Sequence, residues 1–475
     1  MRHEWLFRSG WVEWSADEVQ DEKLDYEKSQ ARINEARTAA LEEIWRERGL
    51  DGILALASIS GALGVIGWHL AAHVITPEGA PGFIKDCLAS TPPDIGVEKI
   101  NELLRGFLAS LPSESRERLL RTLVPQLPSG EIVRLLKSSP FMAATWAHVD
   151  RQSPELQTQY WREVFPGWMS PDSPDINESV DRLIAAARPR LAFNTFHYSL
   201  EKIETSRLAR LLREIATCAN EEAGTNQISA HDISEAFDLL QKRSGVGTDE
   251  LAQLEFMFIQ ALDDTKHGIP NLERQIGRSP ALFVQALALI YKRSDEGVDP
   301  PEWRIDDPGR RSSIANAAWH LIRAIKQVPG TAEVGTVDGK RLREWVIEAR
   351  ALCAEHGREA IGDQMIGQIL AVAPEGKDGI RPCEPVRDVL EEIGTEDIAR
   401  GFTVAVRNSR GGWSRSLDEG GEQERALAEQ FRRSSQQIAF DYPYVSRILA
   451  DLAEMYEHEG SREDSQARIR KRVGR

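Results

Sequence analysis

The sequence predicts an all-α protein whose helices form an α-solenoid, a HEAT- or TPR-like helical-repeat array that could consist of two packed halves. Leucine, alanine, glutamate and arginine dominate the chain and runs of β-branched residues are scarce, which favours helices over strands. In many segments the apolar residues recur every three or four positions, as they do along one face of a helix. Both observations point to helices throughout the chain.

A third observation is a proline that recurs where a short apolar helix meets a helix rich in aromatic residues. Such junctions occur at Pro140, Pro189 and Pro280, which are 49 and 91 residues apart. These distances are close to one and two periods of about 45 residues, the length of a HEAT-type repeat. Units of this kind pack on their neighbours to form an array. The three copies are imperfect, so a generic helical bundle is the alternative.

Residues 1–50 are predicted to form an N-terminal aromatic segment followed by a long helix. Trp5, Trp11 and Trp14 precede this helix, and aromatic residues this dense usually pack against another part of a protein. The helix is charged and is expected to extend to about Arg48. The sequence leaves open whether its first methionine is the true start of the protein.

Residues 51–300 are predicted to form the helical-repeat array. Within them, 52–75 contain no Asp, Glu, Lys or Arg over 24 residues, which is long enough to span a bilayer. However, Gly61, Gly64 and Gly67 interrupt the stretch, and no cluster of basic residues flanks it to set an orientation. The sequence therefore favours a buried repeat core over a membrane segment.

A polar linker rich in proline and aspartate, 295–313, separates this array from a C-terminal helical domain at 313–475. This domain is expected to end in a helical hairpin. Its first helix begins near Glu422, and its second begins at Pro443, because proline suits the first position of a helix. Gly460 is expected to end the second helix, and a last short helix and a basic tail should follow.

The charge and the cysteines limit the function classes. The net charge of −16 argues against a general nucleic-acid binder, because phosphates would be repelled by the average surface. The four cysteines are scattered and suggest no disulfide framework, which fits a reducing compartment. The N-terminus lacks the apolar core of a signal peptide, so we expect a cytoplasmic protein. The cysteines are Cys87, Cys218, Cys353 and Cys383.

No motif for catalysis emerges. The run from Gly335 to Arg341 is like a phosphate-binding loop, but it is one residue short and has Arg341 where Ser or Thr should hold magnesium. Cys353 and His356 have a metal-like spacing without a second pair of ligands. No nucleophile elbow occurs. We therefore expect no enzymatic activity, cofactor or metal.

Candidate partner contacts lie in three loops, because exposed aromatic residues and arginines dominate interface energetics. One loop covers 166–177, one is the linker, and one covers 407–423, where arginines surround two Gly-Gly pairs before a helix begins. The start of a helix attracts anions, but acidic residues crowd this one. Three interpretations of the last loop therefore stay open: a structural turn, a partner contact and a nucleotide site. The candidate partner-binding residues are Trp168, Trp303, Arg407, Arg410, Trp413 and Arg415.

The run 407–411, the run 419–428, Tyr442-Pro443 and the run 453–456 together resemble a known type of region. They look like the C-terminal helical region of large bacterial STAND-type NTPases associated with phage defence or signalling. In such proteins an effector and a nucleotide switch precede a helical array that senses the trigger. The resemblance implies a sensor-like array, whereas the chain itself has no phosphate-binding loop and no effector signature.

The predicted function is that of a non-enzymatic scaffold or sensor that binds a protein partner. No small-molecule substrate is evident, and neither a nucleic acid nor a membrane is expected as the main partner. The alternative is a nucleic-acid-associated regulator that uses the basic tail at 468–475. Salt-dependent retention on DNA that is lost when the tail is deleted would favour this alternative.

Overall fold

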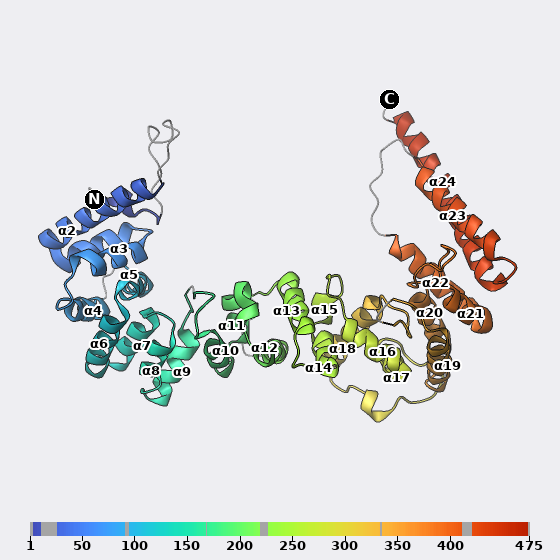
Figure 1. Cartoon of the computed structure of the whole chain (residues 1–475), viewed down its shortest axis with the longest axis horizontal. Helices are drawn as coiled ribbons and strands as arrows, with labels where there is room; N and C mark the ends of the chain where they lie inside the picture. Colours follow the sequence, from blue (N-terminus) through green and yellow to red (C-terminus); the bar gives the residue numbers. More distant parts are fainter. Residues whose placement is uncertain are drawn as a thin grey trace. The chain divides into compact units, whose positions relative to one another are not determined.

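The structure is a computed structural model that describes residues 3–10, 26–90, 95–167, 169–218, 227–332, 335–410 and 420–473. Throughout these ranges the regular structure is helical (Figure 1), and extended pairing is limited to a single bridge between Thr331 and Val337. The prediction of an all-α array of packed helices is thus confirmed. Whether the repeats are of the HEAT or TPR type stays a prediction.

The chain divides into two compact units, Met1–Ile228 and Ser229–Arg475. The helices of the first unit are η1 (Glu4–Phe7), α2 (Tyr26–Ile59), α3 (Leu63–His69), η2 (Leu70–Val74), α4 (Ala80–Ala89), α5 (Val97–Ser110), α6 (Ser113–Leu123), η3 (Val124–Gln126), α7 (Ser129–Ser138), α8 (Ala143–Val149), α9 (Pro154–Glu163), α10 (Ile176–Ala185), α11 (Pro189–Phe196), η4 (His197–Lys202) and α12 (Thr205–Thr217).

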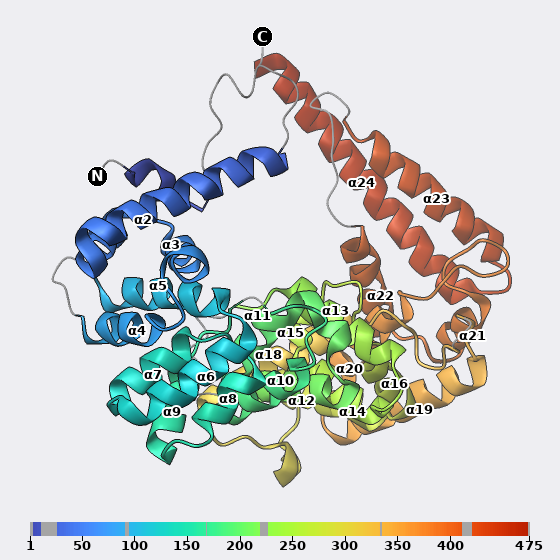
Figure 2. The same cartoon turned by 60° about the vertical axis from the view of Figure 1, so that its left-hand side comes forward.

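Alternate helices of the first unit pack on one another, since α3 contacts α5, α5 contacts α7 and α7 contacts α9 (Figure 2). Each of these helices carries an apolar stripe that must be buried against a neighbour. A stack of this kind buries the stripes in succession, so the core extends from helix to helix. One continuous apolar cluster accordingly reaches from η1 to the end of α9.

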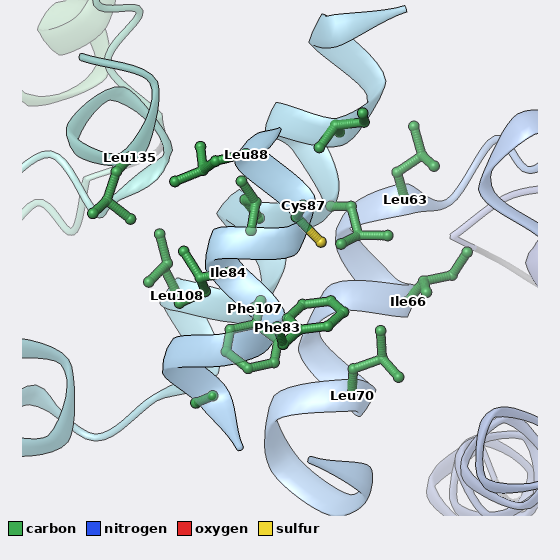
Figure 3. Packing of buried hydrophobic residues seen from close by; sticks show 14 of the residues in the cluster. Leu63, Ile66, Leu70, Phe83, Ile84, Cys87, Leu88, Phe107, Leu108 and Leu135 are labelled. Carbon is green, nitrogen blue, oxygen red and sulfur yellow. The ribbon is translucent and has the colours of Figure 1, made fainter. Parts of the chain in front are cut away.

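The apolar stretch at 52–75 lies in this cluster, where α3, α4 and α5 meet (Figure 3). Ile66 of α3 and Leu70, the first residue of η2, are buried beside Phe83 and Phe107, whose rings are 4.8 Å apart (Figure 3). The favoured interpretation as buried core is therefore confirmed for these residues. Among the described residues, no helix combines the length and the apolar run that a bilayer crossing requires.

Helices α3 and α5 cross at glycines. A Cβ atom on Gly67 would lie 1.9 Å from the carbonyl oxygen of Leu103, and one on Gly106 would lie 1.9 Å from that of Gly64. Real Cβ atoms do not approach other atoms this closely, so both crossing points require glycine. The glycines at 64 and 67 lie within α3, whereas the break before this helix falls at 60–62.

The helices of the second unit are α13 (Ala230–Lys242), α14 (Thr248–Met257), α15 (Ile259–Leu262), α16 (Pro270–Arg278), α17 (Pro280–Ile290), η5 (Pro301–Trp303), α18 (Pro308–Ala324), α19 (Gly339–Glu355), α20 (Glu359–Leu370), α21 (Glu384–Ile393), α22 (Glu396–Ser409), α23 (Glu422–Ile438) and α24 (Pro443–Val473). Alternate helices pack here as well, with α14 against α16, α17 against α19, and α20 against α22. The predicted linker connects α17 to α18 within this unit.

The C-terminal hairpin forms as predicted, with α23 packed along α24 and α24 starting at Pro443. The prediction that Gly460 ends the second helix is wrong, because α24 continues without a break to Val473. A Cβ atom on Gly421 would lie 2.1 Å from the carbonyl oxygen of Gly460. Gly460 therefore lies inside α24 where Gly421, before the first residue of α23, passes close to it; a Cβ atom on Gly460 would lie 3.2 Å from the carbonyl oxygen of Gly421. The predicted last short helix does not exist separately.

Arginines from neighbouring helices close several helix ends. Arg116 donates a hydrogen bond of 3.1 Å to the carbonyl of Leu111 at the end of α5, and Arg358 donates one of 2.9 Å to that of Tyr291 at the end of α17. Arg188 does the same at the end of α9. The last carbonyls of a helix have no partner within it and carry partial negative charge, which a guanidinium satisfies. Many of the charged side chains therefore have structural roles.

Candidate partner-binding groove

The structure describes three of the six predicted contact residues. Trp303 lies in the second unit beside a groove, and Arg407 and Arg410 lie together in the same unit near the start of the C-terminal hairpin. Trp168 lies outside the described residues, as do the two further predicted contacts of the 407–423 loop, Trp413 and Arg415.

The groove lies between α14, α16, α17 and α18 and has a volume of about 830 Å³. Volumes of 300 to about 1,000 Å³ are typical of ligand sites in proteins. Its floor and walls are mainly apolar, and they combine buried side chains with partly exposed ones. The principal apolar side chains are Phe256, Leu272, Ile276, Ala286, Leu289 and Ile314.

The sequence of α17 explains why the groove is apolar. This helix reads Pro-Ala-Leu-Phe-Val-Gln-Ala-Leu-Ala-Leu-Ile and is apolar on nearly every side. A helix of this kind is expected to be buried all round. Phe283 and Leu287 are indeed buried completely, but Leu282 retains 37% of its surface and lies at the groove. Met257, on the opposite wall, is 45% exposed.

A strap at 301–307 borders the groove along one side. The ring of Trp303 packs against that of His356 at 4.5 Å between centroids, and Arg304 donates a hydrogen bond of 2.8 Å to the carbonyl of Asp299. Asp299 is in turn held by two hydrogen bonds from the buried Arg358. The strap is therefore anchored to the end of α19 and the start of α20.

The polar groups of the groove are few, and the charges among them balance. Three glutamines contribute amides to its walls, and at the strap Arg304 and Arg310 are offset by Asp306 and Asp307. Asp307 also accepts a hydrogen bond from the backbone N–H of Arg310 and so caps α18. Such a surface suits apolar contact with a few polar anchors. The glutamines are Gln253, Gln275 and Gln285.

The arginine pocket, about 310 Å³ in volume, lies between the end of α22 and the hairpin. Arg407 donates a hydrogen bond of 3.0 Å to Glu459, and Arg410 pairs with the buried Glu424. The guanidinium of Arg410 also lies 5.5 Å from the centroid of the Tyr456 ring. These carboxylates compete with any anion for the two arginines. The predicted arginines thus join the hairpin to α22.

No group of three or more His, Cys, Asp or Glu side chains in the described ranges is arranged to hold a metal ion. Cys353, which has the metal-like spacing with His356, is buried, and this burial raises the pKa of its thiol to about 12. A thiol is a metal ligand only as the thiolate. In this structure Cys353 is a buried thiol in the core of the second unit.

Trp303, which the sequence suggests as a partner contact, borders the groove, whereas the apolar side chains that line the same groove were not predicted. Ile305 could have been found as an isoleucine inside a polar linker, whereas nothing in the sequence marks Met257 or Leu282 as part of the groove. Comparison of the chain with models of protein families, with curated proteins and with solved structures finds no match.

Proposed function

We propose that this protein is a non-enzymatic helical-repeat scaffold or sensor, and that its groove binds the apolar face of an amphipathic helix from a protein partner. The observation that carries the proposal is the groove itself, an apolar hollow of about 830 Å³ between four helices. Met257 and Leu282 at its mouth keep much of their apolar surface in water, and burying such surface favours association.

A helical occupant fits the groove better than an extended peptide. An extended peptide needs partners for its backbone N–H and C=O groups, because burying them unpaired is costly. The described walls supply three glutamine amides and a few charged groups at the strap. A helix satisfies its own backbone and presents apolar residues at i, i+3, i+4 and i+7. The balanced charges at the strap favour no strongly charged partner.

The resemblance of the C-terminal region supports a biological setting for this proposal. We propose a cytoplasmic protein that acts as the sensing array of a bacterial STAND-type NTPase or as a separately encoded partner of one. A helical array suits that role because it offers a long surface and needs no reactive group.

A display selection of short helical peptides against the full chain tests the groove. We expect enriched peptides to carry the i, i+3, i+4, i+7 apolar pattern. The double variant Met257→Glu, Leu282→Glu should weaken their binding about tenfold or more, because both carboxylates would face the apolar side of the peptide. Both positions are partly exposed, so the variant should fold.

Ile347→Glu is the matched control, since Ile347 is 43% exposed on α19 and does not line the groove. It should bind the enriched peptides as the unmodified chain does. Equal binding by the double variant, or enrichment of peptides without a helical apolar pattern, would contradict the proposal.

A further inference from the structure

His267 lies in the turn before α16 and is almost completely enclosed, with a side chain that is 3% exposed. A carboxylate faces each of its ring nitrogens. Nδ1 is 2.8 Å from Oδ1 of Asp238 on α13, and Nε2 is 3.5 Å from Oε1 of Glu255 on α14. The imidazole therefore connects three successive parts of the second unit.

This geometry favours the doubly protonated ring. A neutral imidazole has one N–H and one lone pair, so one of the two carboxylates would face a lone pair. The imidazolium donates a hydrogen bond to Asp238 and places its second N–H, and its positive charge, 3.5 Å from Glu255. Burial by itself lowers the pKa of His267, but the interactions with Glu255 and Asp238 outweigh it and leave the pKa raised above its usual range.

Glu255 makes the charge of His267 important for α16. Its side chain is fully buried and caps the start of this helix, where Pro270 has no N–H to offer. Oε2 accepts a hydrogen bond of 2.7 Å from the backbone N–H of Leu272, and Oε1 accepts one of 3.2 Å from that of Asn271 and one of 2.6 Å from its side chain. A buried carboxylate is costly unless a cation accompanies it.

The neighbouring charged groups are engaged with one another. On α18, His320 lies 2.8 Å from Asp263, and Lys326, which follows that helix, donates from Nζ to the carbonyl of Asp263. Glu273 on α16 accepts from backbone N–H groups at 326 and 327, and burial, together with the charge of Glu255, raises its pKa. The charge of His267 is therefore governed by its two direct carboxylate neighbours, Glu255 and Asp238.

We propose that His267 is a pH-sensitive clamp whose positive charge fastens the start of α16 to α14 and whose deprotonation loosens that helix start. Helix α16 supplies Leu272, Gln275 and Ile276 to the groove, so loss of the charge would also weaken partner binding, a consequence that rests on the proposed function. The charge of His267 stabilises the start of α16 fully below the ordinary histidine pKa of about 6.5. This stabilisation is lost as pH rises through the raised pKa of His267 in the folded protein.

Hydrogen exchange across 268–278 in the full chain, corrected for the intrinsic pH dependence of exchange, tests the clamp. In the unmodified chain, we expect protection to fall as pH rises above about 6.5. His267→Gln cannot become charged, so its protection should be about tenfold lower at pH 6 and should converge with that of the unmodified chain at high pH. His231→Gln is the control, because His231 is on α13 with a side chain that is 79% exposed.

Glu255→Gln provides a second variant that keeps the shape of the buried side chain but removes its charge. Protection of 268–278 in this variant should depend far less on pH. Protection of the unmodified chain that does not change with pH, or that rises with it, would overturn the clamp. If protection changes with pH while affinity for the selected helical peptides does not, the clamp stands and the groove is the wrong binding site.

Discussion

The two units each contain a pair of helices that cross in the same register. In the first unit, Gly67 of α3 faces the carbonyl of Leu103 on α5, and Gly106 faces that of residue 64. In the second unit, Gly367 of α20 faces the carbonyl of Ile398 on α22, and Gly401 faces that of residue 364. Each glycine lies three residues beyond the carbonyl that faces its partner, so the two crossings match residue for residue.

The sequences of the two pairs match as well. Ile66-Gly67-x-x-Leu70 corresponds to Ile366-Gly367-x-x-Leu370, and Arg105-Gly106-Phe107 corresponds to Arg400-Gly401-Phe402. The isoleucines, leucines and phenylalanines of both sets are buried. One packing arrangement of a helix pair therefore occurs once in each unit.

The pairs differ in what surrounds the crossing. Four residues before the first glycine, α3 has the buried Leu63 whereas α20 has the buried Asp363. Asp363 accepts hydrogen bonds from Arg350 at 2.8 Å and from Thr395 at 2.8 Å, and Ile100 occupies the position of Thr395 in the first unit. The glycines thus set the distance between the backbones, while the flanking side chains can be either apolar or part of a polar network.

The largest expected effect comes from exchanging these flanking side chains. Leu63→Asp would bury a carboxylate that has no arginine beside it, and we expect a loss of about 4 kcal/mol in the stability of the first unit. Asp363→Leu should cost about 2 kcal/mol, because Arg350 and Thr395 would lose an acceptor. Hydrogen exchange across 63–110 and 359–409 in a denaturant series measures each unit separately. Equal losses of stability in Leu63→Asp and Asp363→Leu would contradict the difference between an apolar and a polar surrounding of the two crossings.

A smaller loss is expected when the crossing itself is changed. Gly67→Ala and Gly367→Ala would each place a methyl group about 2 Å from a carbonyl oxygen, 1.9 Å at Gly67 and 2.1 Å at Gly367. The helices must then move apart, at a cost of about 3 kcal/mol. Similar losses in the two units, measured by the same exchange series, would support the equivalence of the crossings.

Gly64→Ala is the control within the same helix, because a Cβ atom at Gly64 would meet nothing within 4 Å. It should stabilise α3 by up to about 1 kcal/mol, since alanine favours a helix more than glycine does. A loss at Gly64 as large as that at Gly67 would show that the close approach is not the cause.

A further effect, which appears only at acid pH, concerns His69, whose counterpart in α20 is Ile369. Burial, and then the charges of Arg37 and His73, lower the pKa of His69 to about 4. The folded form thus disfavours the imidazolium, so stability that is present above pH 6.5 should be lost as pH falls to about 4. We expect the first unit to lose about 2 to 3 kcal/mol over this interval.

His69→Ile should abolish the loss of stability at acid pH, because it gives α3 the residue that α20 has at this position. The measurement is hydrogen exchange in 63–110 during urea unfolding, repeated over a series of pH values. His73→Gln is the control, since His73 is exposed and should leave most of the acid sensitivity in place. Acid sensitivity that survives in His69→Ile would assign it to another group.

The helices and their starts were largely predictable from local signals. Pro443 starts α24, and Thr395 and Asp338 cap helices where the sequence places a break. Gly460 was misjudged because a glycine that ends a helix and a glycine that admits a neighbouring backbone look alike in a sequence.

The groove was harder to predict because it depends on helices far apart in the chain. Trp303 was identified by residue type, but Met257 and Leu282 look like ordinary core residues until their surroundings are known. The same holds for His267, which the sequence does not bring near Asp238 or Glu255. Local patterns describe single elements, whereas these sites arise from contacts between them.

The arginines at helix ends have a practical consequence for dividing this chain. Arg116, Arg188 and Arg358 each lie beyond the helix that they close, so a fragment that stops at the end of that helix leaves its last carbonyls open. A fragment ending after α5, for example, should be less soluble and more easily cut by proteases than one that continues through α6. Truncation points are better chosen after the helix that supplies the guanidinium.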